Sequence, residues 1–337
     1  MEADASERAR EDGDRSRTKK TRRRRWLRVG FGLAGLTAAS VLVWHVGPTR
    51  IGRALLRAAP WVPLALLLEG ARLGVEAWAT RRLYASLEGS LPRRAVLRAQ
   101  LLAYPVFVLA PAGRAACEAT KAGMLGGYVG RSRAAAVAAV GQAVALIGTA
   151  LLSVICALAA TFRPGAWDLA VAIWTQTAAV AVLGGVMLWA FRRRSVGRVV
   201  AKILGWAGVA EDQRQQFGHS VRALPPLPWP PTLGYFASRS LSAGVFFVLL
   251  VAVGAGPDPL AALRAMGVSL VGATAVDFVP ADLGLTEGAF TLWASDVGVE
   301  PAQGVAIGVL FHVVQVTWVA IGAVAAFVWS APPEEAR

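Results

Sequence analysis

The chain has 337 residues, of which 55% are hydrophobic and only 17% are charged. With a mean hydropathy of +0.51, this composition excludes an ordinary soluble domain and indicates a multi-pass membrane protein. The formal net charge of +14 fits cytoplasmic loops that contact anionic lipid, so we do not expect nucleic acid as a partner.

The first segment of the chain, residues 1–25, mixes both signs of charge and contains few apolar side chains. Such a segment cannot bury a core, so we expect a disordered, basic cytoplasmic tail. No small-residue cleavage site follows the first apolar run, and a signal peptide is therefore not expected.

Six apolar segments are long enough to cross a bilayer, which takes about 20 residues in a helix. In chain order, these predicted spans are 26–46, 61–80, 134–160, 167–191, 232–254 and 302–329. The expected fold class is therefore an all-α polytopic membrane protein.

Two further apolar regions, 95–129 and 260–297, are interrupted near the middle, at LAPAGRAACEATK and FVPADLGLTEG. Each half is too short to cross a bilayer comfortably, which favours two re-entrant helical hairpins that return to their own side. The residues expected to act as hinges are Pro111, Gly113, Pro280 and Gly284.

The distribution of Lys and Arg sets the expected orientation. The N-terminal tail and the basic stretches TRRLYASLEGSLPRR, GRSR and FRRRSVGRVVAKILGW fall inside, whereas the short loop 47–57 and the stretch GAGPDPL fall outside. Both termini are then cytoplasmic, with membrane halves at 26–191 and 232–329 and a short tail at 330–337. A cytoplasmic, partly amphipathic connector at 192–231 joins the two halves.

The two halves also share an internal repeat. AVLRA in the first half matches AALRA in the second, and in each half a proline precedes a glutamate by seven residues, at Glu118 and Glu287. Arg72 and Arg239 occupy similar places in the preceding spans. Because one span joins the copies, the second copy starts on the opposite side of the membrane. This arrangement predicts an inverted repeat, as in many transporters.

Ionisable residues inside a span are costly unless they are paired or hydrated, so they are functional candidates. Glu69, Arg72 and Glu76 lie at i, i+3 and i+7 on one helical face, where they can neutralise each other. A purely structural ion-pair ladder is the alternative to a functional role for these three. For Arg239, the alternative is a side chain that extends toward the membrane interface.

Charged residues also accompany both breaks. The helix that follows a break presents free backbone N–H groups, which suit an anion such as a lipid phosphate. The residues expected to bind a headgroup are Arg72, Arg114, Lys121 and Arg239. The residues expected to gate or couple its movement are Glu69, Glu76, Glu118, Asp277, Asp282 and Glu287.

Three polar residues in the spans, Gln142, His312 and Gln315, are expected to support the site through hydrogen bonds between helices rather than to bind a ligand directly. Cys117 and Cys156 have no metal-ligand spacing, and the three histidines are scattered along the chain. We therefore expect neither a metal nor a cofactor.

The stretch FVPADLGLTEGAFTLWASDVGVEPAQGVAIGVLFHVVQ resembles the C-terminal signature of the lysylphosphatidylglycerol synthase transmembrane (flippase-like) family. LAPAGRAACEATKAGML resembles the turn in the first half of that family. Two departures stand out, since Asp282 replaces a second glycine and Glu118 lies one residue further from Gly113 than the family pattern has it. The resemblance covers 26–329 and includes no aminoacyl-transfer domain, so it implies the membrane half without the synthase.

This resemblance and the residues together predict a transporter or flippase in the bacterial inner membrane, and not an enzyme. A polar or anionic headgroup would pass between the two hairpins. The expected partners are membrane lipids, either phospholipid or isoprenoid-linked, and a homodimer and a lipid-synthesising enzyme stay open. The alternatives are a non-catalytic subunit or scaffold of a lipid-synthesis system and, less favoured, a membrane-embedded lipid-modifying enzyme. The enzyme alternative is weakened because no nucleophile has a nearby base.

Overall fold

The computed structural model describes residues 48–87, 91–110, 112–193, 211–275 and 284–329, and every regular element in these ranges is a helix. In chain order the helices are α2 (Pro48–Ala58), η1 (Ala59–Trp61), α3 (Val62–Ala85), α4 (Arg93–Leu109), α5 (Gly113–Val129), α6 (Arg131–Thr161), α7 (Trp167–Arg192), α9 (Glu211–Ala223), α10 (Trp229–Val253), α11 (Pro259–Ala275), α12 (Leu285–Leu292), α13 (Ala294–Val297) and α14 (Pro301–Val328). The all-helical class is confirmed.

Within the described ranges, five helical stretches are long and apolar enough to cross a membrane. They are Gly52–Ala85, Arg131–Thr161, Trp167–Arg192, Trp229–Val253 and Pro301–Val328. Each contains most of one predicted span, so these five predictions are confirmed apart from their ends. The sixth predicted span, at 26–46, lies outside the described residues.

The loop expected at 47–57 is wrong, because α2 occupies this segment and continues through η1 into α3. Pro60 and Pro63 lie in the first positions of η1 and α3. A proline in the first turn of a helix loses no hydrogen bond. The chain therefore stays helical from α2 through η1 into α3 despite these two prolines.

Both interrupted regions are broken helices, as the sequence predicts. In the first, α4 ends at Leu109 and α5 begins at Gly113, directly after Ala112, whose φ of 52° is left-handed. In the second, α11 ends at Ala275 and α12 follows Gly284, whose φ is 80°. Residue 111 and residues 276–283 lie outside the described residues, and so do the predicted hinge prolines and the predicted gating residues Asp277 and Asp282.

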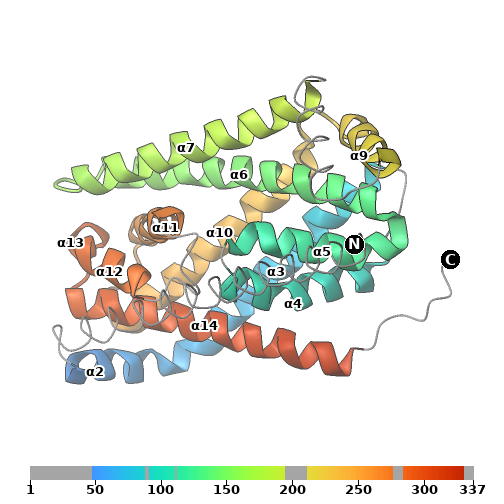
Figure 1. Cartoon of the computed structure of the whole chain (residues 1–337). Helices are drawn as coiled ribbons and strands as arrows, with labels where there is room; N and C mark the ends of the chain where they lie inside the picture. Colours follow the sequence, from blue (N-terminus) through green and yellow to red (C-terminus); the bar gives the residue numbers. More distant parts are fainter. Residues whose placement is uncertain (1–47, 88–90, 111, 194–210, 276–283, 330–337) are drawn as a thin grey trace, which may run out of the picture.

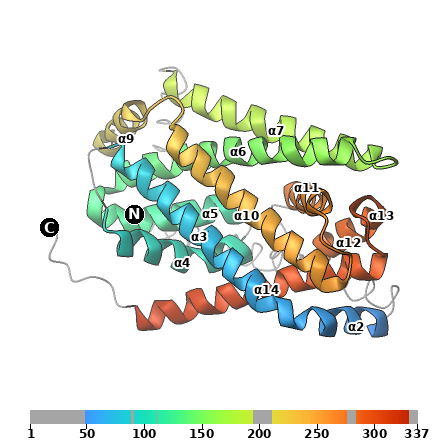
Figure 2. The same cartoon turned by 180° about the vertical axis from the view of Figure 1, so that it is seen from behind.

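The helices form a bundle in which α6 and α7 run along one side while α2 and α14 run along the other (Figure 1). Helices α3 and α10 pack against each other and cross between these two sides, which is clearest from behind (Figure 2). Helices α4 and α5 lie toward one end of the bundle, and α11, α12 and α13 lie toward the other (Figures 1 and 2). The two broken helices are thus separated by the crossing pair.

The packing of the two halves is reciprocal. Helix α4 packs against α14, and α11 packs against α6, so the first arm of each broken helix contacts the long helix that follows the other broken helix. Small residues permit the close approach: a Cβ atom at Gly322 would lie 2.5 Å from the carbonyl oxygen of Leu101. Likewise, a Cβ atom at Gly267 would lie 2.3 Å from Ile173 Cδ1 on α7.

In the described part of the predicted connector at 192–231, helix α9 packs against α6 and α7 (Figure 1). The basic stretch that precedes α9, at 194–210, lies outside the described residues. Two large buried apolar clusters stabilise the bundle, one centred on α10, α11 and α14 and one on α3, α4 and α6.

Candidate functional site

The charged residues near the middle of α3 form a buried ion-pair ladder. Arg72 Nη2 lies 2.6 Å from Glu69 Oε1, and Arg72 Nη1 lies 2.9 Å from Glu76 Oε1. All three side chains are buried. The spacing of i, i+3 and i+7 predicts this geometry, because residues three and four apart meet on one helical face. Arg72 is therefore held by two carboxylates of its own helix.

This ladder continues into α4 and α5. Gln100 Nε2 donates to Glu76 Oε2 at 2.9 Å, and Lys121 Nζ donates to Gln100 Oε1 at 3.1 Å. Lys121 also lies 2.7 Å from Glu118 Oε1. On the same face of α4, the hydroxyl of Tyr104 donates to a carboxylate oxygen of α3 at 2.9 Å. The buried network thus joins three helices and neutralises Lys121 from within its own helix.

Arg239 on α10 is only partly buried and differs from the buried cations Arg72 and Lys121. Among the described residues, no carboxylate lies within ion-pair distance of its guanidinium, although the neighbouring Ser238 hydroxyl donates to Glu76 at 3.2 Å. The charge of Arg114 is partly balanced, because its Nη1 lies 3.6 Å from Glu76 Oε1 and its guanidinium lies over the ring of Tyr235. Near the centre of the bundle, the positive charge of Arg114 is therefore only weakly neutralised by a described carboxylate, and that of Arg239 is not neutralised by one.

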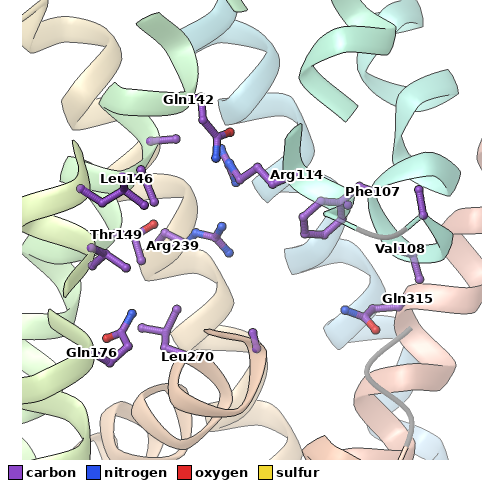
Figure 3. Close-up of a pocket in the computed structure, with 16 residues that line it drawn as sticks. Phe107, Val108, Arg114, Gln142, Leu146, Thr149, Gln176, Arg239, Leu270 and Gln315 are labelled. Atoms are coloured by element: carbon purple, nitrogen blue, oxygen red, sulfur yellow. The ribbon is translucent and has the colours of Figure 1, made fainter. Parts of the chain in front are cut away.

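Both of these arginines line a central cavity of about 240 Å³. The cavity lies where the first break meets the middles of the long helices, and its wall combines charged, amide and apolar side chains. Its polar lining residues are Arg114, Gln142, Thr149, Gln176, Arg239 and Gln315. Figure 3 shows Arg239 extending toward the open centre, with Gln142 and Arg114 together on one side and Gln315 on another.

A smaller cavity of about 90 Å³ adjoins the first one. It shares five lining residues with the central cavity, namely Phe107, Arg239, Leu270, Ala273 and Gln315, and it extends to Glu69, Arg72 and His312. Together the two compartments lie just above the lower limit of about 300 Å³ that is usual for ligand pockets. This space suits the headgroup of a lipid rather than a whole lipid molecule.

A surface groove of about 520 Å³ adjoins the central cavity. Its wall consists mainly of alanine and glycine from α5 and α6, with Met187 from α7, and Glu118 and Arg131 are its charged lining residues. Gln142 lines both the groove and the cavity, and Leu183, one turn before Met187, lines the cavity and is half exposed. A largely apolar groove on the side of the bundle therefore lies next to the polar cavity.

The second break carries its own buried pair. Glu287 Oε1 lies 3.1 Å from His312 Nδ1, and Glu287 Oε2 accepts a hydrogen bond from the backbone N–H of Gly284 at 2.9 Å. Glu287 thus caps the first turn of α12, where a carboxylate is favoured by the helix dipole. In this structure Glu287 contacts α14 and its own helix, and it forms no ion pair with Arg72 or Arg239.

The structure brings most of the predicted site residues to one region. The residues that line the two cavities are Glu69, Arg72, Gly113, Arg114, Gln142, Arg239, His312 and Gln315. Lys121 lies outside both cavities within the buried network, while Glu118 faces the groove. In the described part of the chain, no group of three or more His, Cys, Asp and Glu side chains is arranged to hold a metal.

Sequence reasoning missed three polar residues of this region, Gln100, Tyr104 and Gln176. Gln100 and Tyr104 lie four residues apart in an apolar helix, which puts them on one face and could have indicated them. Gln176 is buried near the middle of α7, and its Oε1 has no hydrogen-bond partner. A lone amide in an otherwise apolar span was the available signal for this residue.

Comparison with known proteins matches residues 26–323 to the family model described as the lysylphosphatidylglycerol synthase TM region. The match covers most of the chain, including every helix described above except the end of α14. No curated protein and no solved structure matches the chain.

Proposed function

The chain belongs to the lysylphosphatidylglycerol synthase TM family, a membrane family linked to lipid metabolism, and we propose that it moves a lipid with an anionic headgroup across the bacterial cytoplasmic membrane. The observation that carries this proposal is Arg239, a cation without a described carboxylate partner that extends into a cavity near the middle of membrane-spanning helices.

An unpaired charge inside a membrane bundle is costly, and such residues face a bundle interior or a wet cavity where they serve a substrate path. Arg239 lies near the middle of α10, and Arg114 begins the first turn of α5 beside it. Guanidinium groups bind phosphate through paired hydrogen bonds. A phosphate in the cavity would supply the negative charge that the described protein groups leave unfilled.

The groove supplies a path for the hydrocarbon part of such a lipid. Ala119, Gly123 and Ala135 in its wall are exposed, and they leave room for a chain between α5, α6 and α7. Because Gln142 belongs to both spaces, a headgroup in the cavity can connect to a chain in the groove without leaving the surface of the protein. This arrangement favours a lipid over a free soluble anion.

Two features support the proposed inverted repeat and the alternating access that follows from it. A long helix, a 17-residue helix, a break, a second arm and a final long helix follow one another twice, from α3 to α6 and from α10 to α14, although the second arm is the 17-residue α5 in one copy and the shorter α12 and α13 in the other. The reciprocal contacts of α4 with α14 and of α11 with α6 are those expected of two copies related by a pseudo-twofold axis.

The lengths of α4 and α5 support a re-entrant hairpin. Each has 17 residues, which corresponds to about 25 Å at 1.5 Å per residue. This length is shorter than the hydrocarbon core of about 30 Å. The two helices pack against each other, and Ala112 between them has the left-handed backbone that a sharp reversal needs.

A transport assay tests the proposal directly. Purified protein is reconstituted into vesicles that contain phosphatidylglycerol with a fluorescent label on one acyl chain, and dithionite then reports the fraction of label reaching the outer leaflet, with and without a proton gradient. Wild-type protein should accelerate the movement, and Arg239→Gln should abolish it. Arg222→Gln, on the exposed surface of α9, is the matched control and should behave as wild type.

Protein that is well folded but moves no labelled lipid under either condition would overturn the proposal. In that event the chain would be better described as a subunit or scaffold, which co-purification of a lipid-synthesising enzyme in stoichiometric amount would support.

A further inference from the structure

From the lining of the central cavity we infer the class of headgroup that it takes: a phosphate that carries a neutral, hydroxyl-rich group such as a sugar or a polyol. The inference rests on the proposed function, because it names the ligand of the same site. It departs from what the family description suggests, since a lysyl ester would bring a cationic group into the cavity.

The phosphate of the inferred headgroup follows from the two arginines that line the cavity. Arg239 has no described ion-pair partner, and Arg114 shares Glu76 only at 3.6 Å while its buried Nε has no hydrogen-bond partner. They approach the cavity from two different helices, α10 and α5. Two guanidinium groups that converge on one space bind a phosphate more specifically than one alone.

The neutral, hydroxyl-rich part of the inferred headgroup follows from the glutamine amides that line the cavity. Gln142, Gln176 and Gln315 reach the cavity from α6, α7 and α14, and Thr149 adds a hydroxyl beside them (Figure 3). Gln176 is only 7% exposed, and the Oε1 atoms of Gln142 and Gln176 are buried without any partner. A buried polar atom without a hydrogen-bond partner destabilises the protein by about 1–3 kcal/mol. A ligand that donates a hydrogen bond to these amide oxygens would remove this cost.

A hydroxyl group is the partner that fits these amides. Each amide offers two N–H donors and a carbonyl acceptor, and rotation about its terminal torsion presents either end to the cavity. A phosphate diester has no hydrogen to donate, so it cannot satisfy the carbonyl oxygens. Hydroxyl groups donate and accept at once, which lets a sugar or polyol satisfy amides on three separate walls.

The charges of the described lining disfavour a cationic headgroup. Arg114 and Arg239 face the central cavity, whereas none of its described lining residues is acidic. The nearest carboxylates are already engaged: those of α3 by Arg72, Glu118 by Lys121, and Glu287 by His312. An ammonium group in this space would meet like charge without a described counter-ion, which is unfavourable at short range.

Competition between three lipids tests this inference. The protein is embedded in nanodiscs of phosphatidylcholine with equal amounts of phosphatidylinositol, phosphatidic acid and lysylphosphatidylglycerol, and native mass spectrometry counts the lipids that stay bound. Phosphatidylinositol presents a polyol on its phosphate, phosphatidic acid presents the bare phosphate, and the third lipid presents the cation. Wild-type protein should retain phosphatidylinositol about tenfold over either competitor, the order of discrimination that hydrogen bonds to buried amides provide.

Variants separate the two parts of the site. Gln176→Leu should reduce the preference for phosphatidylinositol over phosphatidic acid to near one while phosphatidic acid is still retained, whereas Arg239→Gln should lose both lipids. Gln215→Leu, on the exposed face of α9, is the control and should keep the wild-type preference. If Gln176→Leu fails to fold, Gln142→Leu tests the same step from α6.

Equal or stronger retention of lysylphosphatidylglycerol by wild-type protein would overturn the inference, as would an unchanged preference in a folded amide variant. These outcomes are distinct from those of the transport assay. A preference for phosphatidylinositol without transport would overturn only the proposed function, and transport without that preference would overturn only the headgroup class.

Discussion

Arg72 and Arg239 lie near the middles of the adjacent helices α3 and α10 and line the same small cavity, but only Arg72 is neutralised by carboxylates of the described chain. Arg72 is bound by Glu69 and Glu76, whereas Arg239 has neither within ion-pair distance. Two residues that look equivalent in the sequence therefore differ in their surroundings, since Arg72 completes a buried ion-pair network and Arg239 has no described carboxylate partner.

The first prediction concerns the stability of variants at these two positions. Arg72→Gln leaves two buried carboxylates without their cation, so it should lower the free energy of unfolding by about 3–5 kcal/mol. Arg239→Gln breaks no described ion pair, so it should leave the thermal unfolding temperature in detergent close to that of wild type. A loss of stability in Arg239→Gln as large as that in Arg72→Gln would contradict the distinction drawn here.

The second prediction concerns Lys121 and Glu118 on α5, which are buried and 2.7 Å apart. Lys121→Met and Glu118→Gln should each destabilise the protein, because each leaves an uncompensated buried charge. The double variant should be more stable than the sum of the single effects implies, with an interaction energy of about 1–3 kcal/mol. Thermal unfolding of all four proteins gives this value, and strict additivity would show that the pair is not coupled.

The third prediction concerns the gating role that the sequence predicts for Glu287. Glu287→Gln keeps an oxygen that can accept from the Gly284 N–H but removes the charge that faces His312. Movement of labelled phosphatidylglycerol in vesicles should be abolished, while the unfolding temperature should stay near the wild-type value. Glu211→Gln, on the exposed part of α9, serves as the control. Wild-type rates in Glu287→Gln would count against any gating or coupling role.

The fourth prediction concerns the geometry of the first break. A Cβ atom at Gly113 would lie 2.0 Å from the carbonyl oxygen of Phe107, a distance that the backbone must open to accommodate. Gly113→Ala should therefore lower the free energy of unfolding by at least about 1–3 kcal/mol. Gly127→Ala on the same helix meets nothing within 4 Å and should be neutral or stabilising by up to about 1 kcal/mol. Similar unfolding temperatures for both variants would contradict the tight packing of the break.

The elements that the sequence predicts well are those with local causes. Hydropathy and length identify the five described spans, and proline and glycine mark both breaks. The ladder of Glu69, Arg72 and Glu76 follows from helical spacing alone. The prediction of a loop at 47–57 is wrong because its one proline, Pro48, is the first residue of α2, where a helix tolerates proline, and because its arginines alternate with apolar residues in an amphipathic helical pattern.

The partners of these residues depend on contacts between helices, which no local pattern encodes. The bridge from Glu76 through Gln100 to Lys121 requires α3, α4 and α5 to meet. Glu118 and Glu287 each lie seven residues after a proline, but α5 begins five residues before Glu118 and α12 only two before Glu287. For this reason only Glu287 caps its helix, a difference that the repeat in the sequence conceals.

The wall of the groove has a consequence for the choice of lipid. Alanine and glycine have no side-chain rotamer freedom to lose when a hydrocarbon tail packs against them. Binding of a tail in the groove therefore costs the protein little conformational entropy. A smooth wall of methyl groups also distinguishes poorly between one hydrocarbon and another of similar width. The protein would then be tolerant of tail length, unsaturation and branching, and mixed populations of tails should copurify with a single kind of headgroup.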